Sequence, residues 1–284
     1  MARPVTRMKV DACIWTKNSS KFLPITLKAF DAAVPKDVLG QRIMVDDHSE
    51  DKTIEIGKNY GWHTYTNPGI GIASAANEAL NHVTTPFFIS IEHDVILAKD
   101  WFTRLFPRIR DHDNVAVCQG IRLPTNRTLL VIFGQEVWKG YSIDNNIYRT
   151  RVIRRLGGFP GKCRGNHTDG WLKKAVEDAG YEWVIDSSVV SEHIYNGIRY
   201  YWRKEATIRL CTCGCAQQGR VGEFSRLFRL AVISPPYGLQ IALRHNQPGA
   251  IFAYPYHRFR LMQAWLTKTM LFTTKTGDDL EKGL

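Results

Sequence analysis

The chain has 284 residues, 44% of them hydrophobic, so it is long enough to bury a large core in one sizeable domain with an extension. No apolar run approaches the length of a membrane span and residues 1–10 lack the apolar segment of a secretion signal, so we expect a cytoplasmic protein. Six scattered cysteines exclude a disulfide scaffold, and the net charge of +11, from 38 basic and 27 acidic residues, indicates an anionic partner.

Strands and helices alternate through the first part of the chain. The expected elements are a strand at 10–16, a helix capped by residues 18–20 and ended by Pro35, a strand at 42–45, a helix at 52–60, a strand at 62–65, a helix at 72–82, a strand at 87–97, a helix at 101–109 and strands at 115–121 and 183–190. This alternation predicts an α/β fold with a mostly parallel sheet flanked by helices.

The apolar run Phe87–Leu97 carries Glu92, His93 and Asp94 at its polar end. In an open α/β sheet, ligands bind at the carboxyl ends of the strands, so two carboxylates there can face a hard divalent cation. Acidic triplets are also common in solvated turns, and the triplet alone leaves both interpretations open.

A pair of acids, Asp46 and Asp47, follows the second expected strand. The layout is that of a nucleotide-binding fold, but the chain lacks both the G-x-G-x-x-G and the Walker phosphate-binding motifs. Phosphate would have to be held in another way, and a metal ion bound by the acids is the obvious candidate.

Four successive motifs have the same order and spacing as those of a known family. They are Thr16-Lys17-Asn18, Val45 to Asp51, Asn67-Pro68-Gly69 to Asn77, and Ile91-Glu92-His93-Asp94. Over about the first 200 residues the chain resembles family 2 glycosyltransferases with the GT-A fold. The resemblance implies a metal-dependent, inverting transfer of a hexosyl group from a nucleoside diphosphate sugar, with UDP or GDP as nucleotide, to a hydroxyl or phosphate of a glycan or lipid-linked acceptor.

The resemblance also implies roles for individual residues. Asp46 and Asp47 would face the nucleoside, and Asp94 would be the principal ligand of Mn2+ or Mg2+. Glu92 replaces the usual Asp and would contact either ribose or metal. His193 resembles the late histidine that completes metal coordination, although a lone histidine is more often structural. The full set implied for binding of the nucleotide sugar is Thr16, Asn18, Asp46, Asp47, Gly71, Asn77, Glu92 and His93.

The resemblance implies a catalytic base in a Glu-Asp pair at the start of a helix that ends in Gly-aromatic. Glu177-Asp178 has these letters but lies only two residues before Gly180, at the wrong end of the helix. Asp169 precedes Gly180 by eleven residues and follows the Gly157-Gly158-Phe159 loop, so we assign Asp169 as the base. Thr168 stands where the family has Glu.

The chain is strongly basic after the expected catalytic domain, residues 1–198. Residues 199–268 contain eleven Lys or Arg and two acids, a net charge of +9. Apolar stripes edged by arginine, such as Phe224, Leu227, Phe228 and Ala231, predict a 199–284 extension of amphipathic helices that could lie on an anionic membrane surface. Packing on the catalytic domain or in a homo-oligomer is the alternative, and nucleic acid is not expected because no recognition motif is present.

A different class of function also stays open, since the chain could be a non-catalytic GT-A-like protein that binds glycans or membranes. The Cys-x-Cys-x-Cys segment at 211–215 lacks the spacing of a zinc site and is interpreted as incidental.

Overall fold

A computed structural model of the protein describes residues 8–133, 140–161, 168–194, 198 and 220–267. The chain forms two compact units, the first comprising residues 1–122, 139–161 and 168–194 and the second comprising 123–138, 162–167 and 195–284. The expected boundary between a catalytic domain and an extension at residue 198 stays a prediction. The 211–215 cysteine segment lies outside the described residues.

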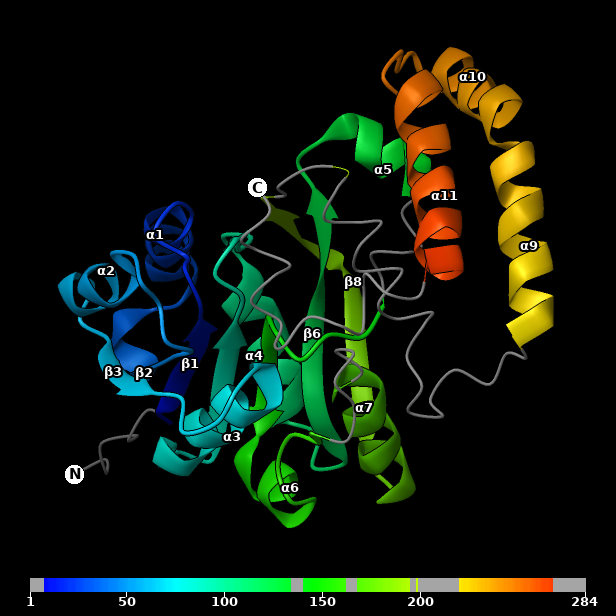
Figure 1. Ribbon diagram of the computed structural model, residues 1–284. Coiled ribbons are helices and arrows are strands. Elements are labelled where there is room, and N and C mark those ends of the chain that lie inside the picture. Colours follow the sequence, from blue (N-terminus) through cyan, green and yellow to red (C-terminus); the bar gives the residue numbers. More distant parts are fainter. Residues whose placement is uncertain (1–7, 134–139, 162–167, 195–197, 199–219, 268–284) are drawn as a thin grey trace, which may run out of the picture. The chain divides into compact units, whose positions relative to one another are not determined.

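One sheet lies at the centre of the first unit, and eight described strands run through it in the order β3-β2-β1-β4-β7-β6-β8-β5 (Figure 1). Their bounds are β1 Val10–Thr16, β2 Leu39–Asp46, β3 His63–Thr66, β4 Phe87–Ile91, β5 Val95–Ile96, β6 Val115–Pro124, β7 Asn146–Arg149 and β8 Glu182–His193. Strands β3, β2, β1 and β4 are parallel, whereas β7 pairs antiparallel with β4 and β6, and β5 pairs antiparallel with β8. The predicted α/β sheet is confirmed.

Helices cover both faces of this sheet. They are α1 Leu23–Ala33, α2 Thr53–Asn59, α3 Ile72–His82, α4 Trp101–Arg110, α6 Thr150–Arg155 and α7 Thr168–Asp178, with a 3-10 turn at Lys36–Val38. Alternate residues of β1 enter different cores, Ala12 and Ile14 with α1 and α4, and Cys13 and Trp15 with α3, α6 and α7. A strand that is buried on both faces has a nearly continuous apolar sequence. Strand β1 is buried along its whole length, so the sequence predicts it.

Two local expectations were wrong. The first residue of α1 is Leu23 and its N-cap, Phe22, makes no side-chain capping bond, because Asn18 accepts from the backbone N–H of Glu50 instead. Proline at the start of the helix supplies the pre-set backbone angle. The expected strand 87–97 is interrupted, since β4 ends at Ile91 and the acids occupy the turn before β5.

Strand β7 and helices α5 and α6 were not predicted. The short strand β7 contains Asn146 and Arg149, polar residues that argue against a buried strand. Both are buried here because Asn146 donates to the Tyr148 hydroxyl (2.7 Å) and Arg149 Nε donates to the Val115 carbonyl (3.0 Å). The bond of Arg149 spans 34 positions of the sequence, so periodicity could not reveal the strand.

The second unit contains α5 Arg127–Phe133, α9 Arg220–Val232, α10 Ser234–His245 and α11 Ala250–Thr267, and α11 packs against each of the others. Both interpretations of the apolar stripes, a membrane interface and packing on protein, stay predictions. Leu227 and Ala231 are buried, but Phe228 is 50% exposed, and on α11 Phe259 and Leu266 are exposed. The buried side of α11 is instead formed by Ala250, Tyr254, Leu261 and Ala264. Within the described part of the chain, no helix is long and apolar enough to cross a bilayer.

Candidate active site

Glu92, Asp94 and His193 meet at one edge of the sheet, with ligand atoms that all lie within 4.8 Å of one another. The antiparallel register pairs Val95 of β5 with His193 of β8, which places the imidazole beside the β4–β5 turn. His193 Nε2 is 2.9 Å from Asp94 Oδ1 and 3.8 Å from Glu92 Oε2. Asp94 and His193 are both buried. The three predicted metal ligands are therefore brought together.

The charge state of Asp94 suits a ligand. Burial alone would raise the pKa of this carboxyl, but the charge and hydrogen bond of His193, with the nearby His93 and Arg122, hold its pKa below the usual range. Asp94 is consequently ionised at neutral pH. Two carboxylates and one imidazole fit Mn2+ or Mg2+, which keep further positions for water and phosphate oxygens.

A positive charge that the sequence did not single out lies next to this cluster. Arg122 on β6 places its Nη1 3.2 Å from Glu92 Oε2, and the same nitrogen donates to Ser142 Oγ (2.6 Å). The backbone N–H of Glu92 donates to the Asn145 side chain (3.3 Å). No motif surrounds Arg122 in the sequence, so only the fold could reveal it.

The acid pair after β2 shapes the neighbouring loops. Asp46 accepts hydrogen bonds from Thr16 Oγ1 (3.3 Å) and from the backbone N–H of Ser49 (2.7 Å). Asp47 accepts from Asn67 Nδ2 (2.5 Å), and Lys17 Nζ is 3.6 Å from its other oxygen. Both acids are buried. The contact of both acids with the nucleoside stays a prediction. Lys17 and Asn67, which were not among the predicted site residues, contact Asp47.

Three other predicted residues occupy turns of the same strand edge. Asn18 has φ +45° after β1, and its side chain holds the 46–51 loop through Glu50 N (2.9 Å). Gly71 is the N-cap of α3 with φ +82°, a conformation that favours glycine, and its N–H points at Asp47 (3.3 Å). The backbone carbonyl of His93 accepts from Thr26 Oγ1 (2.9 Å).

Asn77 on α3 clamps the loop that precedes α7. Its Oδ1 accepts from the backbone N–H of Phe159 (2.7 Å), and its Nδ2 donates to the carbonyl of the same residue (2.9 Å). Gly158 has φ +82°, and a Cβ there would overlap Asn77 Oδ1. The amide predicted to bind the nucleotide sugar is therefore engaged with this loop, and its contact with the sugar stays a prediction.

Replacing Asn77 by alanine is expected to lower the free energy of unfolding by about 1–3 kcal/mol, because two backbone groups of Phe159 lose their partner. Asn81→Ala is the matched control on the same helix, where the side chain is exposed and contacts Glu78. The control should change stability by less than about 0.5 kcal/mol in urea denaturation. Equal effects of the two variants would contradict a structural clamp.

Asp169 lies in the first turn of α7, half-buried, and its Oδ1 accepts from the N–H of Gly170 (2.8 Å). The rejected candidates at the other end of this helix form exposed ion pairs, Glu177 with Lys173 (2.5 Å) and Asp178 with Lys174 (2.9 Å). Such pairs are typical of a solvated helix face. The assignment of Asp169 as base stays a prediction.

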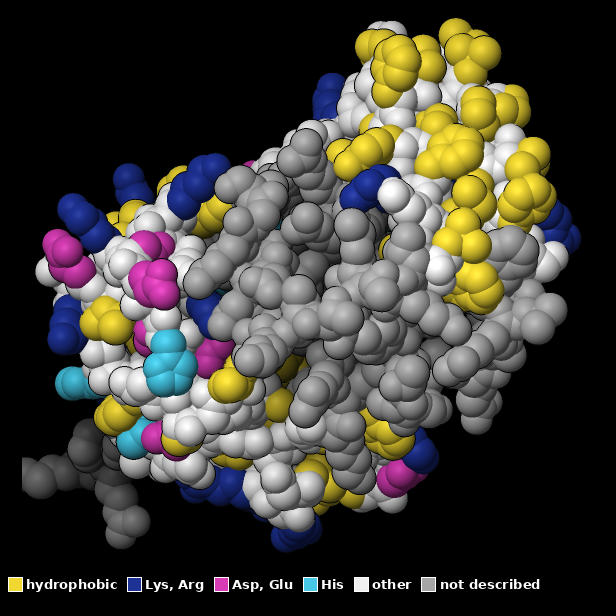
Figure 2. All heavy atoms as spheres, in the orientation of Figure 1, with side chains coloured by type: hydrophobic (Ala, Val, Ile, Leu, Met, Phe, Trp, Pro, Cys, Tyr) yellow, Lys and Arg dark blue, Asp and Glu magenta, His cyan; other side chains and the backbone are white. Residues whose placement is uncertain are grey.

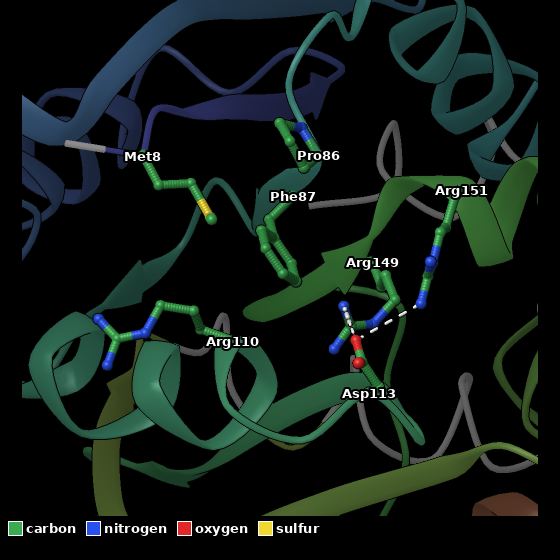
Figure 3. A pocket seen from close by; sticks show the side chains of 7 residues that line it. All are labelled: Met8, Pro86, Phe87, Arg110, Asp113, Arg149 and Arg151. Atoms are coloured by element: carbon green, nitrogen blue, oxygen red, sulfur yellow. Dashed lines mark hydrogen bonds and ion pairs between the residues drawn. The ribbon is translucent and has the colours of Figure 1, made fainter. Parts of the chain in front are cut away.

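A cavity of about 280 Å³ lies at the opposite end of β4, at Phe87 (Figure 3). Three arginines line it, but Asp113 points between Arg149 and Arg151, at 3.3 and 3.5 Å, and Arg110 pairs with Asp111 (2.7 Å). Arg149 also donates to the backbone carbonyl of His112 (2.8 Å). These bonds already engage the arginines, and we assign the chemistry to the acidic edge instead.

Comparison with known proteins bears on both the sequence and the fold. The sequence model described as Glycosyl transferase family 2 matches residues 11–164, more than half of the chain. No curated protein sequence matches the chain.

Several solved structures share the fold. The mannosyltransferase PcManGT from Pyrobaculum calidifontis, in complex with GDP-Man and Mn2+, has a TM-score of 0.60 at 17% identity, covering 96% of this chain and 89% of that chain. S. aureus TarS 1-349 in complex with UDP has a TM-score of 0.54 at 14% identity and 92% coverage of both chains. Glucosyl-3-phosphoglycerate synthase from Mycobacterium tuberculosis, in complex with Mn2+, UDP and glucosyl-3-phosphoglycerate, has a TM-score of 0.54 at 13% identity. The match covers 75% of this chain and 82% of that chain. These similarities confirm the predicted GT-A-like fold.

Proposed function

The chain belongs to glycosyl transferase family 2, and from this membership we propose that it transfers a hexosyl group, with inversion, from a metal-bound nucleoside diphosphate sugar. Membership of the family by itself supports the general reaction, which is transfer of a sugar from a nucleotide sugar. The finer statement rests mainly on one observation, the convergence of Glu92, Asp94 and His193 from two distant segments of the chain.

The donor side of the proposal follows from charge. Glu92, Asp94 and His193 would hold Mn2+ or Mg2+, and a divalent cation there supplies positive charge to the diphosphate as it leaves. Arg122 and Lys17 add fixed positive charge along the same edge, while Asp46 and Asp47 hold the turns that face the nucleoside. UDP and GDP are the proposed nucleotides, supported by similar structures that hold UDP or GDP-Man.

The acceptor side needs a base. Inverting transfer requires a carboxylate that removes the proton of the acceptor hydroxyl as the sugar is attacked from the opposite side. We assign this proton to Asp169, and its half-exposed position in the first turn of α7 supports the assignment because solvent can reach the residue. The proposed acceptor is a hydroxyl or phosphate of a glycan, with a lipid-linked acceptor included.

Metal-dependent binding of one nucleotide sugar tests the proposal directly. We expect the melting temperature to rise with a UDP or GDP sugar only when Mn2+ is present, and to stay unchanged with CDP and dTDP sugars. Release of the nucleoside diphosphate with and without candidate acceptors then measures turnover. A non-catalytic glycan-binding protein is the alternative, and glycan binding with no donor-dependent shift and no nucleotide release would favour it.

A further inference from the structure

The helices of the second unit carry large apolar side chains on their outer surface. Figure 2 shows hydrophobic side chains gathered over α9, α10 and α11 on the face that it draws. The most exposed are Phe252 (78%), Leu243 (76%) and Val232 (59%). Others that are half-exposed are Phe228, Ile233, Tyr237, Leu239, Phe259 and Leu266. Contiguous apolar patches on a protein surface mark interaction sites.

Several of the largest apolar side chains in these helices are exposed, although small residues occupy many of the buried positions. The buried positions of these helices carry the larger Leu227, Tyr254 and Leu261 together with small residues, namely Ala231, Gly238, Ala242, Ala250 and Ala264. A Cβ at Gly238 would lie 2.9 Å from the carbonyl oxygen of Ala250, so α10 and α11 approach closely. The large apolar side chains that remain exposed favour an outer face that is covered by an apolar medium.

The charge of this surface indicates what covers it. Residues 225–266 contain five arginines and neither Asp nor Glu. The arginines flank exposed apolar residues on each helix: Arg229 follows Phe228, Arg244 follows Leu243, and Arg258 and Arg260 enclose Phe259. Apolar side chains bordered by cations and by no acidic residue are complementary to a lipid interface with anionic headgroups.

We propose that the outer face of α9, α10 and α11 docks on an anionic membrane surface. The exposed apolar side chains enter the boundary between headgroups and acyl chains, and the flanking arginines contact lipid phosphates. Since no described helix can cross a bilayer, these helices lie in the interface. The inference does not depend on the sugar-transfer reaction, because it uses no residue of the proposed active site.

Flotation of the full chain with vesicles tests the proposal. We expect binding to vesicles that contain phosphatidylglycerol, little binding to phosphatidylcholine alone, and weakening at high salt. Removing arginine charge in Arg229→Gln/Arg244→Gln should weaken binding by about fivefold for each arginine. Leu243→Ser/Phe252→Ser should weaken it by about tenfold or more, because two exposed apolar side chains no longer enter the interface.

The matched control is Ile25→Ser/Lys28→Gln on α1, where both side chains are exposed on the first unit. The control should float like the wild type, and all variants should keep the melting temperature and the donor response. Absence of flotation with anionic vesicles at low salt would overturn the proposal. So would equal losses in the control, or a dimer that Leu243→Ser/Phe252→Ser dissociates without any vesicle binding, which would assign the face to a second copy of the chain.

Discussion

Replacing Asp94 by asparagine is expected to lower kcat/KM for sugar transfer by about 100-fold or more. Stabilisation of a leaving diphosphate by a bound cation is worth several kcal/mol, and each 1.4 kcal/mol corresponds to about a tenfold change in rate. The amide that replaces the carboxylate has nearly the same size but lacks the negative charge that binds the cation. Steady-state kinetics over a range of Mn2+ concentrations measures the effect.

Direct titration of Mn2+ without nucleotide separates metal binding from catalysis. Asp94→Asn should weaken Mn2+ affinity by more than about tenfold, since a charged ligand is lost. The same titration decides the role of Glu92. If Glu92 is a ligand, Glu92→Gln weakens Mn2+ binding too, whereas a ribose contact leaves metal affinity unchanged and lowers donor affinity only.

Glu192→Gln is the matched control for these acid-to-amide variants, because Glu192 is exposed on β8 directly before His193. It should leave metal affinity and kcat unchanged. Unaltered Mn2+ dependence in Asp94→Asn, with folding intact, would contradict the metal site. The burial of Asp94 and its hydrogen bond to His193 make a stability check necessary, and circular dichroism of each variant supplies it.

Asp169→Asn is expected to reduce kcat by about 10²- to 10⁴-fold while the affinity for the donor and Mn2+ stays unchanged. A positioned general base contributes a factor of this size, and asparagine cannot accept the proton of the acceptor. Rapid-quench measurement of the transfer step, together with donor titration, distinguishes loss of chemistry from loss of binding.

The controls for Asp169 come from the same helix. Glu177→Gln and Asp178→Asn remove carboxylates that form exposed ion pairs with Lys173 and Lys174, and both should turn over normally. Each loses at most a few tenths of a kcal/mol of helix stability. Normal turnover by Asp169→Asn would contradict the assignment of Asp169 as base. Loss of activity in Glu177→Gln would instead assign the base to the other end of α7.

Much of the fold could be predicted from local pattern. The helix at Ile72–His82 has the predicted bounds, and β1 spans the predicted residues, because apolar periodicity records which faces are buried. Strand β7 was not predicted because it contains polar residues, and the buried Arg149 depends on a partner, Val115, that is distant in the sequence. The same holds for the candidate site. The acids at the strand ends could be recognised from local sequence, whereas Arg122 could not, because only the fold brings it to Glu92.

The sequence by itself determined the α/β alternation, the family motifs and the positions of the acids along the chain, since these depend on residues close to one another. The resemblance implied a shared metal site for His193 and Asp94, and the tertiary structure gives the physical reason, because the antiparallel pairing of β5 with β8 brings the two together across 99 positions. Only the tertiary structure decided which side of α11 is buried. The side that packs on α9 and α10 carries Ala250, Tyr254, Leu261 and Ala264, so the large side chains of Phe259 and Leu266 lie outside.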